Sequence, residues 1–164
     1  MGMRSRVAAV GSGVFFAIAP GTVAGVVPWS LTGWRTGAAP LPLRVAGAVL
    51  VIAGAAVLLH AFARFVHEGL GTPAPVAPTA HLVVGGLYRY VRNPMYLAVV
   101  TTILGQALLL GRPVLLAYAG LIAATTATFV HLYEEPTLRA QFGTEYDAYR
   151  EAVPGWWPRR VRDH

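Results

Sequence analysis

Apolar residues occur in four long stretches of this chain, separated by shorter polar segments. The stretches cover residues 7–29, 43–65, 95–110 and 114–130. As helices rising about 1.5 Å per residue, the first two are long enough to cross a hydrocarbon layer about 30 Å thick. The last two are shorter and are joined by Gly111-Arg112-Pro113, a tight-turn signal. The pattern predicts an all-α polytopic membrane protein with four transmembrane helices, the last two forming a short hairpin.

The composition supports a membrane location for the whole chain. Hydrophobic residues make up 55% of the 164 residues and charged residues only 12%. So few charges do not cover the water-facing surface of a soluble domain of this length. We therefore expect one membrane-embedded domain over residues 1–164. The first stretch follows Arg4 and Arg6, but it is long and lacks a clean small-residue cleavage site, which favours a retained span over a signal peptide.

The arginines predict the orientation. All thirteen basic residues are arginine, and four spans with the N-terminus inside place ten of them on the cytoplasmic side. Only Arg35, Arg44 and Arg112 fall outside, which agrees with the excess of positive charge in cytoplasmic loops. Both termini, a loop over 66–93 and a C-terminal segment over 131–164 are then cytoplasmic. The use of arginine alone is typical of a GC-rich genome and favours a bacterial inner membrane.

Several kinds of site are excluded or disfavoured. The chain has no cysteine, which excludes disulfides, thiolate catalysis and cysteine-ligated metal. The five histidines form no ligand pair at helical spacing, so no metal site is predicted. No basic module with aromatic platforms is present, so we attribute the pI near 10.3 to topology and anionic lipid, and expect no nucleic-acid partner.

Small and polar residues inside the spans have structural interpretations. Gly21 and Gly25 form a GxxxG spacing that predicts close helix packing, and Pro20 predicts a kink. Thr102 and Gln106 lie four residues apart and share one face of the third span. Intramembrane polar residues usually face protein, so we favour interhelical hydrogen bonding for this pair over ligand contact.

The polar segments carry their own patterns. The prolines of GTPAPVAP, residues 71–78, predict a stiff extended segment. Beyond the fourth span, apolar residues recur at steps of three and four and predict an amphipathic helical segment: Leu138, Phe142, Tyr146, Tyr149 and Val153. Gly143 is expected to break this helix, and Thr144 with Asp147 to restart it as a capping box. Trp156, Trp157 and the final arginines are typical of a headgroup anchor.

The start of the third span combines a cap with a cation. Asn93 is a good N-cap and Pro94 suits the first helical position. Arg92 is unexpected there, because a cation at a helix N-terminus is disfavoured by about 0.3–1 kcal/mol. A cation beside free N–H groups is, however, a good arrangement for binding an anion.

The end of the fourth span shows the converse. Glu134 and Glu135 follow its predicted last turn, where the helix dipole is negative and two carboxylates need a cation. The hairpin brings this end close to Arg92. Either Arg92 pairs with a glutamate, or the two ends bind a ligand that carries both charges. Nearby aromatic rings and hydroxyls slightly favour the second interpretation, those of Tyr88, Tyr90, Tyr96 and Tyr133.

Four features together resemble a known family: the four spans, GTPAPVAP at 71–78, LVVGGLYRYVRNPMY at 82–96 and LYEEPTLRAQFGTEYDAYREAVPGWWP at 132–158. The chain resembles integral-membrane methyltransferases related to isoprenylcysteine carboxyl methyltransferase and to the phospholipid N-methyltransferases, roughly over 71–159. Two departures stand out. Asn93 replaces the histidine of the prenyl-protein enzymes, and Gly155 occupies a position in the Pro-Arg-aromatic ending where a basic contact is lost.

The resemblance implies S-adenosylmethionine as cofactor, bound at the cytoplasmic membrane boundary. Its carboxylate would suit Arg92, and its amino group or ribose hydroxyls would suit Glu134 and Glu135. Trp156 would help to close the pocket. The implied cofactor-binding residues are Leu82, Gly85, Gly86, Leu87, Tyr88, Arg92, Asn93, Pro94, Tyr96, Glu134, Glu135, Tyr146 and Tyr149.

The implied reaction is methyl transfer to a lipophilic small molecule or lipid, with membrane lipids as the surroundings. A carboxylate acceptor is favoured because it needs no general base, and Arg89 or Arg92 would guide it as the catalytic arginine. Three alternatives stay open: a phospholipid amine N-methyltransferase, an NADPH-dependent sterol-reductase-like enzyme, and a non-enzymatic four-helix membrane protein that binds a lipid or partner.

Overall fold

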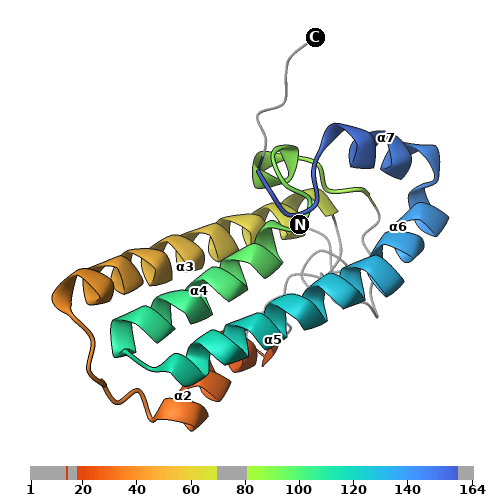
Figure 1. The fold of residues 1–164 in the computed structure, drawn as a ribbon. Helices are drawn as coiled ribbons and strands as arrows, with labels where there is room; N and C mark the ends of the chain where they lie inside the picture. The colour runs from red at the N-terminus through yellow and green to blue at the C-terminus, as the bar shows by residue number, and fades with distance from the viewer. Residues whose placement is uncertain (1–13, 15–17, 70–80, 159–164) are drawn as a thin grey trace. The chain divides into compact units, whose positions relative to one another are not determined.

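The computed structural model describes residues 14, 18–69 and 81–158, and these residues contain helices and no strand. This confirms the all-α class. The helices and their bounds, labelled in Figure 1 where there is room, are η1 Thr22–Val26, α2 Val27–Thr32, α3 Leu41–Gly69, η2 Gly86–Arg89, α4 Pro94–Leu110, α5 Pro113–Phe129, η3 Val130–Glu134, α6 Glu135–Phe142 and α7 Thr144–Ala152. Helices η1 and η3 are π-helices, and η2 is a 3₁₀-helix.

The described residues group into two compact units. The bundle unit comprises residues 18–59 and 95–126, and the cavity unit comprises residues 60–69, 81–94 and 127–158. A single membrane-embedded domain over residues 1–164 stays a prediction.

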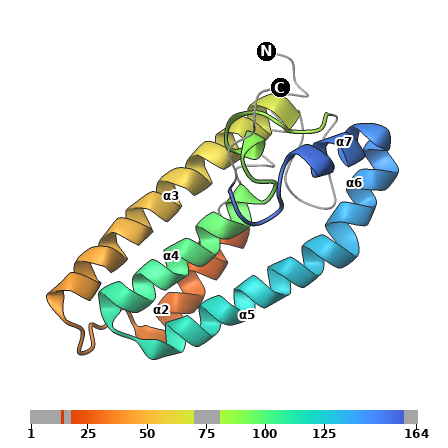
Figure 2. The same ribbon diagram turned by 45° about the horizontal axis from the view of Figure 1, so that its top comes forward.

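Helices α3 and α4 lie side by side in the bundle unit and touch through glycine (Figures 1 and 2). A Cβ atom on Gly47 would lie 2.6 Å from the carbonyl oxygen of Gly105, and one on Gly105 would lie 2.7 Å from the amide nitrogen of Val51. Backbones therefore meet where the sequence offers no side chain. The close packing predicted at Gly21 and Gly25 is not made within the described part of the chain, where nothing lies within 4 Å of a Cβ built at either position. The close packing occurs instead at a glycine pair far apart in sequence.

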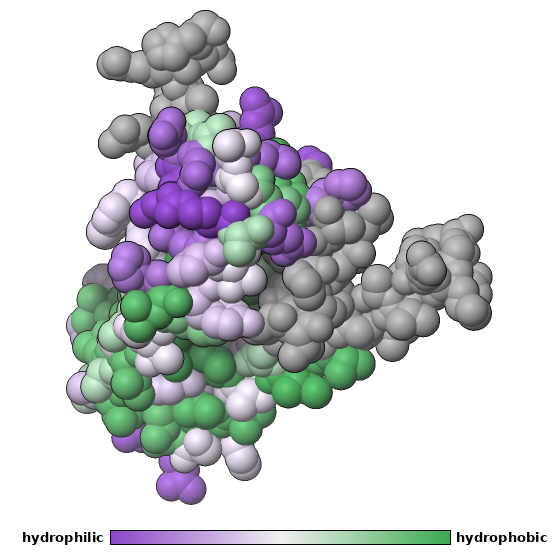
Figure 3. All heavy atoms as spheres, turned by 90° about the vertical axis from the view of Figure 1, so that its right-hand side faces the viewer, coloured by the Kyte–Doolittle hydropathy of each residue, from purple (hydrophilic) through white to green (hydrophobic). Residues whose placement is uncertain are grey.

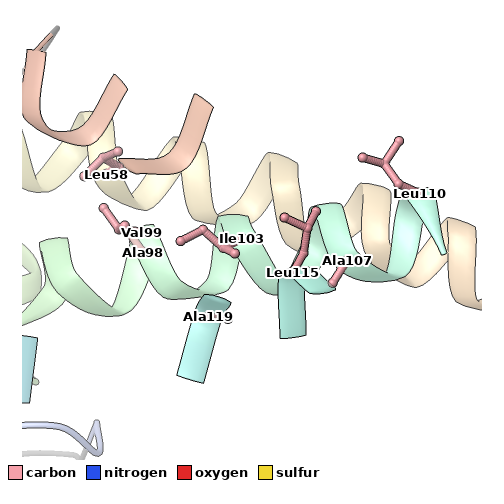
Figure 4. Packing of buried hydrophobic residues seen from close by; sticks show 8 residues of the cluster. All are labelled: Leu58, Ala98, Val99, Ile103, Ala107, Leu110, Leu115 and Ala119. Atoms are coloured by element: carbon pink, nitrogen blue, oxygen red, sulfur yellow. The ribbon is translucent and has the colours of Figure 1, made fainter. Parts of the chain in front are cut away.

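The core of the bundle unit is formed by small and branched aliphatic side chains (Figure 4). Ile103 and Leu115 are fully buried, and Ala119 is almost so. The hydroxyl of Thr102 donates a hydrogen bond to the carbonyl of Ala98 in its own helix. The side-chain amide of Gln106 donates a 2.6 Å hydrogen bond to the carbonyl of Ala24, outside α4. The interhelical bond expected on this face is thus made by Gln106.

Among the described residues, two helices are long and apolar enough to cross a membrane: Leu41–Arg64, with 24 residues, and Pro113–Phe142, with 30 residues. They correspond to the stretches predicted at 43–65 and 114–130. The stretch at 95–110 forms the 17-residue apolar helix α4, joined to α5 by a turn in which Gly111 has φ +63°. The stretch at 7–29 lies partly outside the described residues, so the number of four spans stays a prediction.

The surface of the spanning helices is apolar. Large hydrophobic side chains such as Val49, Ile52 and Leu121 are exposed. Hydrophobic and hydrophilic residues gather in separate areas of the face that Figure 3 displays. An extended apolar surface of this kind is expected where lipid rather than water surrounds a helix.

Two helices extend beyond the predicted spans. Helix α3 continues to Gly69, so the first part of the predicted loop at 66–93 is helical. The helix of the predicted fourth span continues beyond Val130 through η3 into α6 as far as Phe142. Glu134 and Glu135 therefore lie inside a continuous helix, and the dipole at a helix end does not act on them. The proline segment at 71–78, Arg4, Arg6 and the arginines at 159, 160 and 162 lie outside the described residues.

The predicted break at Gly143 is confirmed, and the predicted cap is not. Gly143 adopts φ +55° between α6 and α7, a conformation that favours glycine. Gly143 itself is the N-cap of α7, and no side chain caps the helix. Asp147 instead accepts a 2.7 Å hydrogen bond from Nε of Arg139. The residues of the predicted apolar stripe are buried or half-buried, and most residues between them are exposed.

Candidate functional site

The candidate site lies in the cavity unit, where the segment before α4 meets the segment after α7. The amide of Arg92 donates a 2.9 Å hydrogen bond to the carbonyl of Pro154. The amide of Asn93 donates a 3.3 Å hydrogen bond to the carbonyl of Gly155. The side-chain amide of Asn93 donates to the same Gly155 oxygen at 3.0 Å. These bonds fix Arg92 beside the end of α7. Helix α4 begins at Pro94 as predicted, but the bond made by the Asn93 side chain goes to Gly155.

Arg92 is the polar centre of the site. Its side chain is only 13% exposed and forms a 2.6 Å ion pair from Nη1 to Oε1 of Glu135. The same nitrogen donates to the hydroxyl of Tyr146 at 3.0 Å, and Nε donates to the carbonyl of Val153 at 3.0 Å. A half-buried guanidinium with three partners is held in one orientation.

The second terminal nitrogen of Arg92 is available for a further bond. Within the described part of the chain, Nη2 has no hydrogen-bond partner. It lies against Gly155, where an added Cβ atom would stand 3.1 Å from it. A glycine at this position leaves space beside the guanidinium that any side chain would reduce.

Glu135 interacts with two arginines. Besides the bond to Arg92, its Oε2 lies 3.6 Å from Nη2 of Arg150 on α7. The Glu135 side chain is 16% exposed and that of Arg150 is 41% exposed. One carboxylate therefore faces one held guanidinium and one more mobile guanidinium.

Tyrosines from α7 complete the polar lining. The hydroxyl of Tyr149 donates to the carbonyl of Tyr88 at 2.7 Å, which ties α7 to η2. Burial raises the pKa of Tyr149 well above its ordinary value of 10. Burial also raises the pKa of Tyr146, against the opposing effect of the Arg92 charge. Both phenols are therefore neutral hydrogen-bonding groups near neutral pH, and neither serves as a base.

These side chains surround a cavity of about 70 Å³. Eight predicted site residues are among those that line it: Leu82, Tyr88, Arg92, Asn93, Glu134, Glu135, Tyr146 and Tyr149. The lining combines a cation, two carboxylates, phenols and aliphatic groups. It can hold a ligand that has an anionic group, a cationic or hydroxyl group and an apolar or aromatic part.

Other predicted site residues are not among those that line the cavity. Arg89 is exposed on η2. Gly85, Gly86 and Leu87 form the turn that leads to Tyr88, and Pro94 is buried at the start of α4. Tyr96 belongs to the bundle unit.

Gly86 has a clear structural requirement for glycine. Its φ is +58°, and an added Cβ atom would stand 3.1 Å from Nε2 of His60 and from Nε of Arg64. Its role is therefore to let the turn before Tyr88 pass close to α3.

Sequence reasoning missed four residues of this region. Val83, Val130 and Leu138 line the cavity, and Arg150 contacts Glu135. Leu138 was recognised only as part of the apolar stripe. Val130 and Glu134 lie four residues apart, and so do Glu134 and Leu138, which is a signal for one helix face. Arg150 follows Tyr149 on a helix that was predicted, and its distance from Glu135 in sequence hid the contact.

Helix η3 sets the direction of the two carboxylates. The amide of Glu135 donates to the carbonyl of Val130, five residues earlier, which accommodates one extra residue in the turn. One residue corresponds to about 100° of rotation in an α-helix. The π-helical turn thus brings Glu135 to the side of Val130, Glu134 and Leu138, and all four line the cavity. Short π-helical turns are frequent at functional sites.

Comparison with known proteins adds a family to this geometry. The sequence model of a family described as phospholipid methyltransferase matches residues 43–145. No curated protein and no solved structure matches the chain. The matched range includes Arg92, Glu134 and Glu135 and ends just before Tyr146, so α7 lies almost wholly beyond it.

Proposed function

Because the chain belongs to the phospholipid methyltransferase family and is therefore a methyltransferase, we propose that it methylates a lipophilic acceptor with S-adenosylmethionine bound in the cavity around Arg92. This family membership confirms the resemblance predicted from the sequence. It also sets aside a reductase and a non-enzymatic membrane protein.

The observation that carries the proposal is the charge pattern of the cavity. S-adenosylmethionine has a carboxylate, an amino group, ribose hydroxyls and an adenine ring. Arg92 suits the carboxylate, because its Nη2 is without a hydrogen bond among the described residues. Glu134 and Glu135 suit the amino group or the ribose, and Leu82, Val83 and the tyrosines offer apolar and aromatic surface. The Arg92–Glu135 pair alone would also fit a purely structural role, so the family match is needed beside it.

The size of the cavity adds a requirement. Its volume of about 70 Å³ is below the 300–1,000 Å³ or so of typical ligand pockets. We infer that the cavity widens when the cofactor binds, and that the polar contacts across it rearrange. The exposed Arg150 side chain and the turn at Gly143 are features of this unit that permit such a change.

The chemistry places modest demands on the side chains. When bound, the cofactor supplies a methyl carbon already activated by its sulfonium. The side chains of this chain bind and orient the reactants and exclude water, and such positioning provides much of the rate. Arg92 and its three partners are suited to hold one charged end in a fixed place.

We propose a carboxylate as the acceptor, since it attacks without first losing a proton. A protonated phospholipid amine is the second candidate, favoured by the family's description. It needs a base, and Glu135 is held by two arginines while Tyr146 and Tyr149 have raised pKa values. Glu134 also lines the cavity and is the carboxylate proposed to accept the amine's proton.

Binding of the cofactor is tested by calorimetry on the detergent-purified protein. We expect wild type to bind S-adenosylmethionine with a Kd near 1 µM, about −8 kcal/mol. Arg92→Lys and Glu135→Gln should each weaken binding at least about tenfold, because they remove the guanidinium fork or the carboxylate charge. Arg139→Gln is the matched control, since Arg139 forms an exposed ion pair with Asp147 outside the cavity lining. A folded wild type that does not bind the cofactor contradicts the proposal.

The acceptor is tested by radiolabelled methyl transfer into a bacterial lipid extract. A methyl ester releases volatile radiolabel in strong base, whereas an N-methyl amine keeps it. Base-labile product supports the carboxylate. Base-stable product, lost in Glu134→Gln at neutral pH and partly recovered at higher pH, supports the amine.

A further inference from the structure

Arg150 gives the carboxylate of Glu135 a second guanidinium neighbour. Glu135 receives Nη1 of Arg92 on Oε1 and faces Nη2 of Arg150 from Oε2. Two guanidinium groups thus surround one carboxylate. Arg150 is the looser of the two, because its distance of 3.6 Å exceeds that of a hydrogen bond and its side chain is 41% exposed.

The second arginine changes what Arg92 can attract. A guanidinium that forms a close ion pair has little net charge left for another anion. With Arg150 opposite the other oxygen, the group of three carries one net positive charge. The side chain of Tyr146, which accepts a hydrogen bond from Arg92, is neutral and leaves this balance unchanged.

We propose that Arg150 is a positioning residue that neutralises Glu135 and so allows Arg92 to bind the carboxylate of the methyl donor. This inference rests on the proposed function and names a residue for it on α7, nearly all of which lies beyond the matched range of the family. As Arg92 engages the ligand, Arg150 takes over the carboxylate of Glu135. The ligand's carboxylate then supplies the anion that the group of three otherwise lacks.

The proposal predicts dependence on one chemical group of the ligand. Arg150→Gln should weaken S-adenosylmethionine binding about tenfold. Its effect on decarboxylated S-adenosylmethionine, which lacks the carboxylate, should stay within about twofold. Arg150→Lys should recover most of the lost affinity, because it retains the charge. Calorimetry measures all of these affinities without relying on turnover.

Arg139 provides a matched control on the neighbouring helix α6. It is 55% exposed and forms a 2.7 Å ion pair with Asp147. Arg139→Gln removes the same kind of charge from the same unit and should change neither affinity. A general effect of net charge would appear equally in both variants.

Each outcome has a defined meaning. If wild type binds neither ligand, the proposed function fails. If wild type binds S-adenosylmethionine and Arg150→Gln binds it equally well, or loses both ligands to the same extent, the role of Arg150 is overturned. Arg150→Met keeps the aliphatic stem and replaces the Gln variant should that variant not fold. If neither variant folds, Arg150 is structural and the inference is also overturned.

Discussion

Helix η1 in the bundle unit and helix η3 in the cavity unit interrupt the chain in the same way. Each has five residues, and each is followed after one further residue by a proline, Pro28 or Pro136. In each, the next amide donates to the carbonyl five residues earlier. The proline has no N–H, so two carbonyls in each region lose helical donors.

The two regions differ in how those carbonyls are satisfied. In the bundle unit, the carbonyl of Val23 accepts from the hydroxyl of Tyr118 at 2.8 Å, and that of Ala24 accepts from Gln106 at 2.6 Å. In the cavity unit, the corresponding residues are His131 and Leu132, which are exposed. No side chain of the described residues donates to their carbonyls.

This difference shows two uses of one helix irregularity. Unpaired carbonyls inside an apolar layer cost several kcal/mol each, so the bundle unit supplies polar side chains for them. Where water reaches an exposed residue, its carbonyl can be hydrated. Helix η3 can therefore keep its π-helical turn without dedicated partners, and the turn directs Glu134 and Glu135 to the cavity.

Inserting an alanine after Leu132 should have the largest effect. Leu132 is 69% exposed, so the added residue disturbs little packing. The π-helical turn already accommodates one extra residue, so a second one rotates the residues after it by about 100° relative to those before it. Glu134 and Glu135 should turn away from the cavity, and S-adenosylmethionine affinity by calorimetry should fall at least about 100-fold, near 2.7 kcal/mol.

The control for this insertion is Leu132→Ala, which keeps the number of residues. It should bind S-adenosylmethionine within about twofold of wild type, because Leu132 does not line the cavity. An insertion variant that binds like wild type would show that the helical phase at η3 does not set the direction of the carboxylates.

Gln106→Leu should destabilise the bundle unit by removing the side chain that donates to a carbonyl of η1. The carbonyl of Ala24 would lose its donor in an apolar layer, and the free energy of unfolding should fall by about 2 kcal/mol. Pro28→Ala restores an N–H four residues after Ala24. In that background, Gln106→Leu should cost less, which a double-mutant cycle by thermal unfolding in detergent measures.

Thr126→Val is the control, since the Thr126 hydroxyl donates to the carbonyl of Ile122 within its own helix. Its loss leaves a carbonyl that keeps a helical donor, so the change should be small. Equal costs of Gln106→Leu in the two backgrounds would contradict the link between Gln106 and Pro28.

Much of the fold could be predicted from sequence because apolar periodicity and turn residues act locally. The apolar runs identified α3, α4 and α5, and Gly143 identified the end of α6. The π-helical turns could not be predicted, because an extra residue in an apolar run leaves the run apolar. Pro28 and Pro136 can be read from the sequence, but only the fold shows which carbonyls they leave unpaired.

The candidate site was predictable as far as its charges were conspicuous. Arg92, Glu134 and Glu135 are rare charges beside apolar runs, and all three line one cavity. The reasoning for the glutamates was wrong in one respect, since no helix ends at them. Arg150 was one arginine among several in a polar segment, and its contact with Glu135 follows from the turn at Gly143, whose angle the sequence does not specify.

Gly155→Ala tests whether the space beside Nη2 of Arg92 in the cavity unit is needed for cofactor binding. The added methyl group would stand 3.1 Å from Nη2 of Arg92, so the end of that side chain must shift by a few tenths of an ångström. If Nη2 binds the cofactor carboxylate, affinity should fall about tenfold. The melting temperature should change little, because the amides that donate to Pro154 and Gly155 are retained.

The matched control is Gly120→Ala in the bundle unit, where nothing lies within 4 Å of the added carbon. It should leave cofactor affinity and melting temperature unchanged. An affinity for the cofactor that is the same in Gly155→Ala and wild type would place the carboxylate elsewhere in the cavity.

Tyr149→Phe gives the smallest expected effect and the one that depends on pH. Its hydroxyl donates to the carbonyl of Tyr88, as that of Tyr118 does to Val23, and its removal should cost about 1 kcal/mol of stability at pH 7. Burial raises the pKa of Tyr149 above 10, so the folded protein keeps this proton when the unfolded chain loses it. The contribution of this phenol to the free energy of unfolding is therefore fully present below pH 10. It declines above pH 10, by up to about 1.4 kcal/mol per pH unit. Unfolding measured from pH 8 to 11 should show a shallower decline in Tyr149→Phe, and parallel curves for variant and wild type would show that this phenol is not shielded from water.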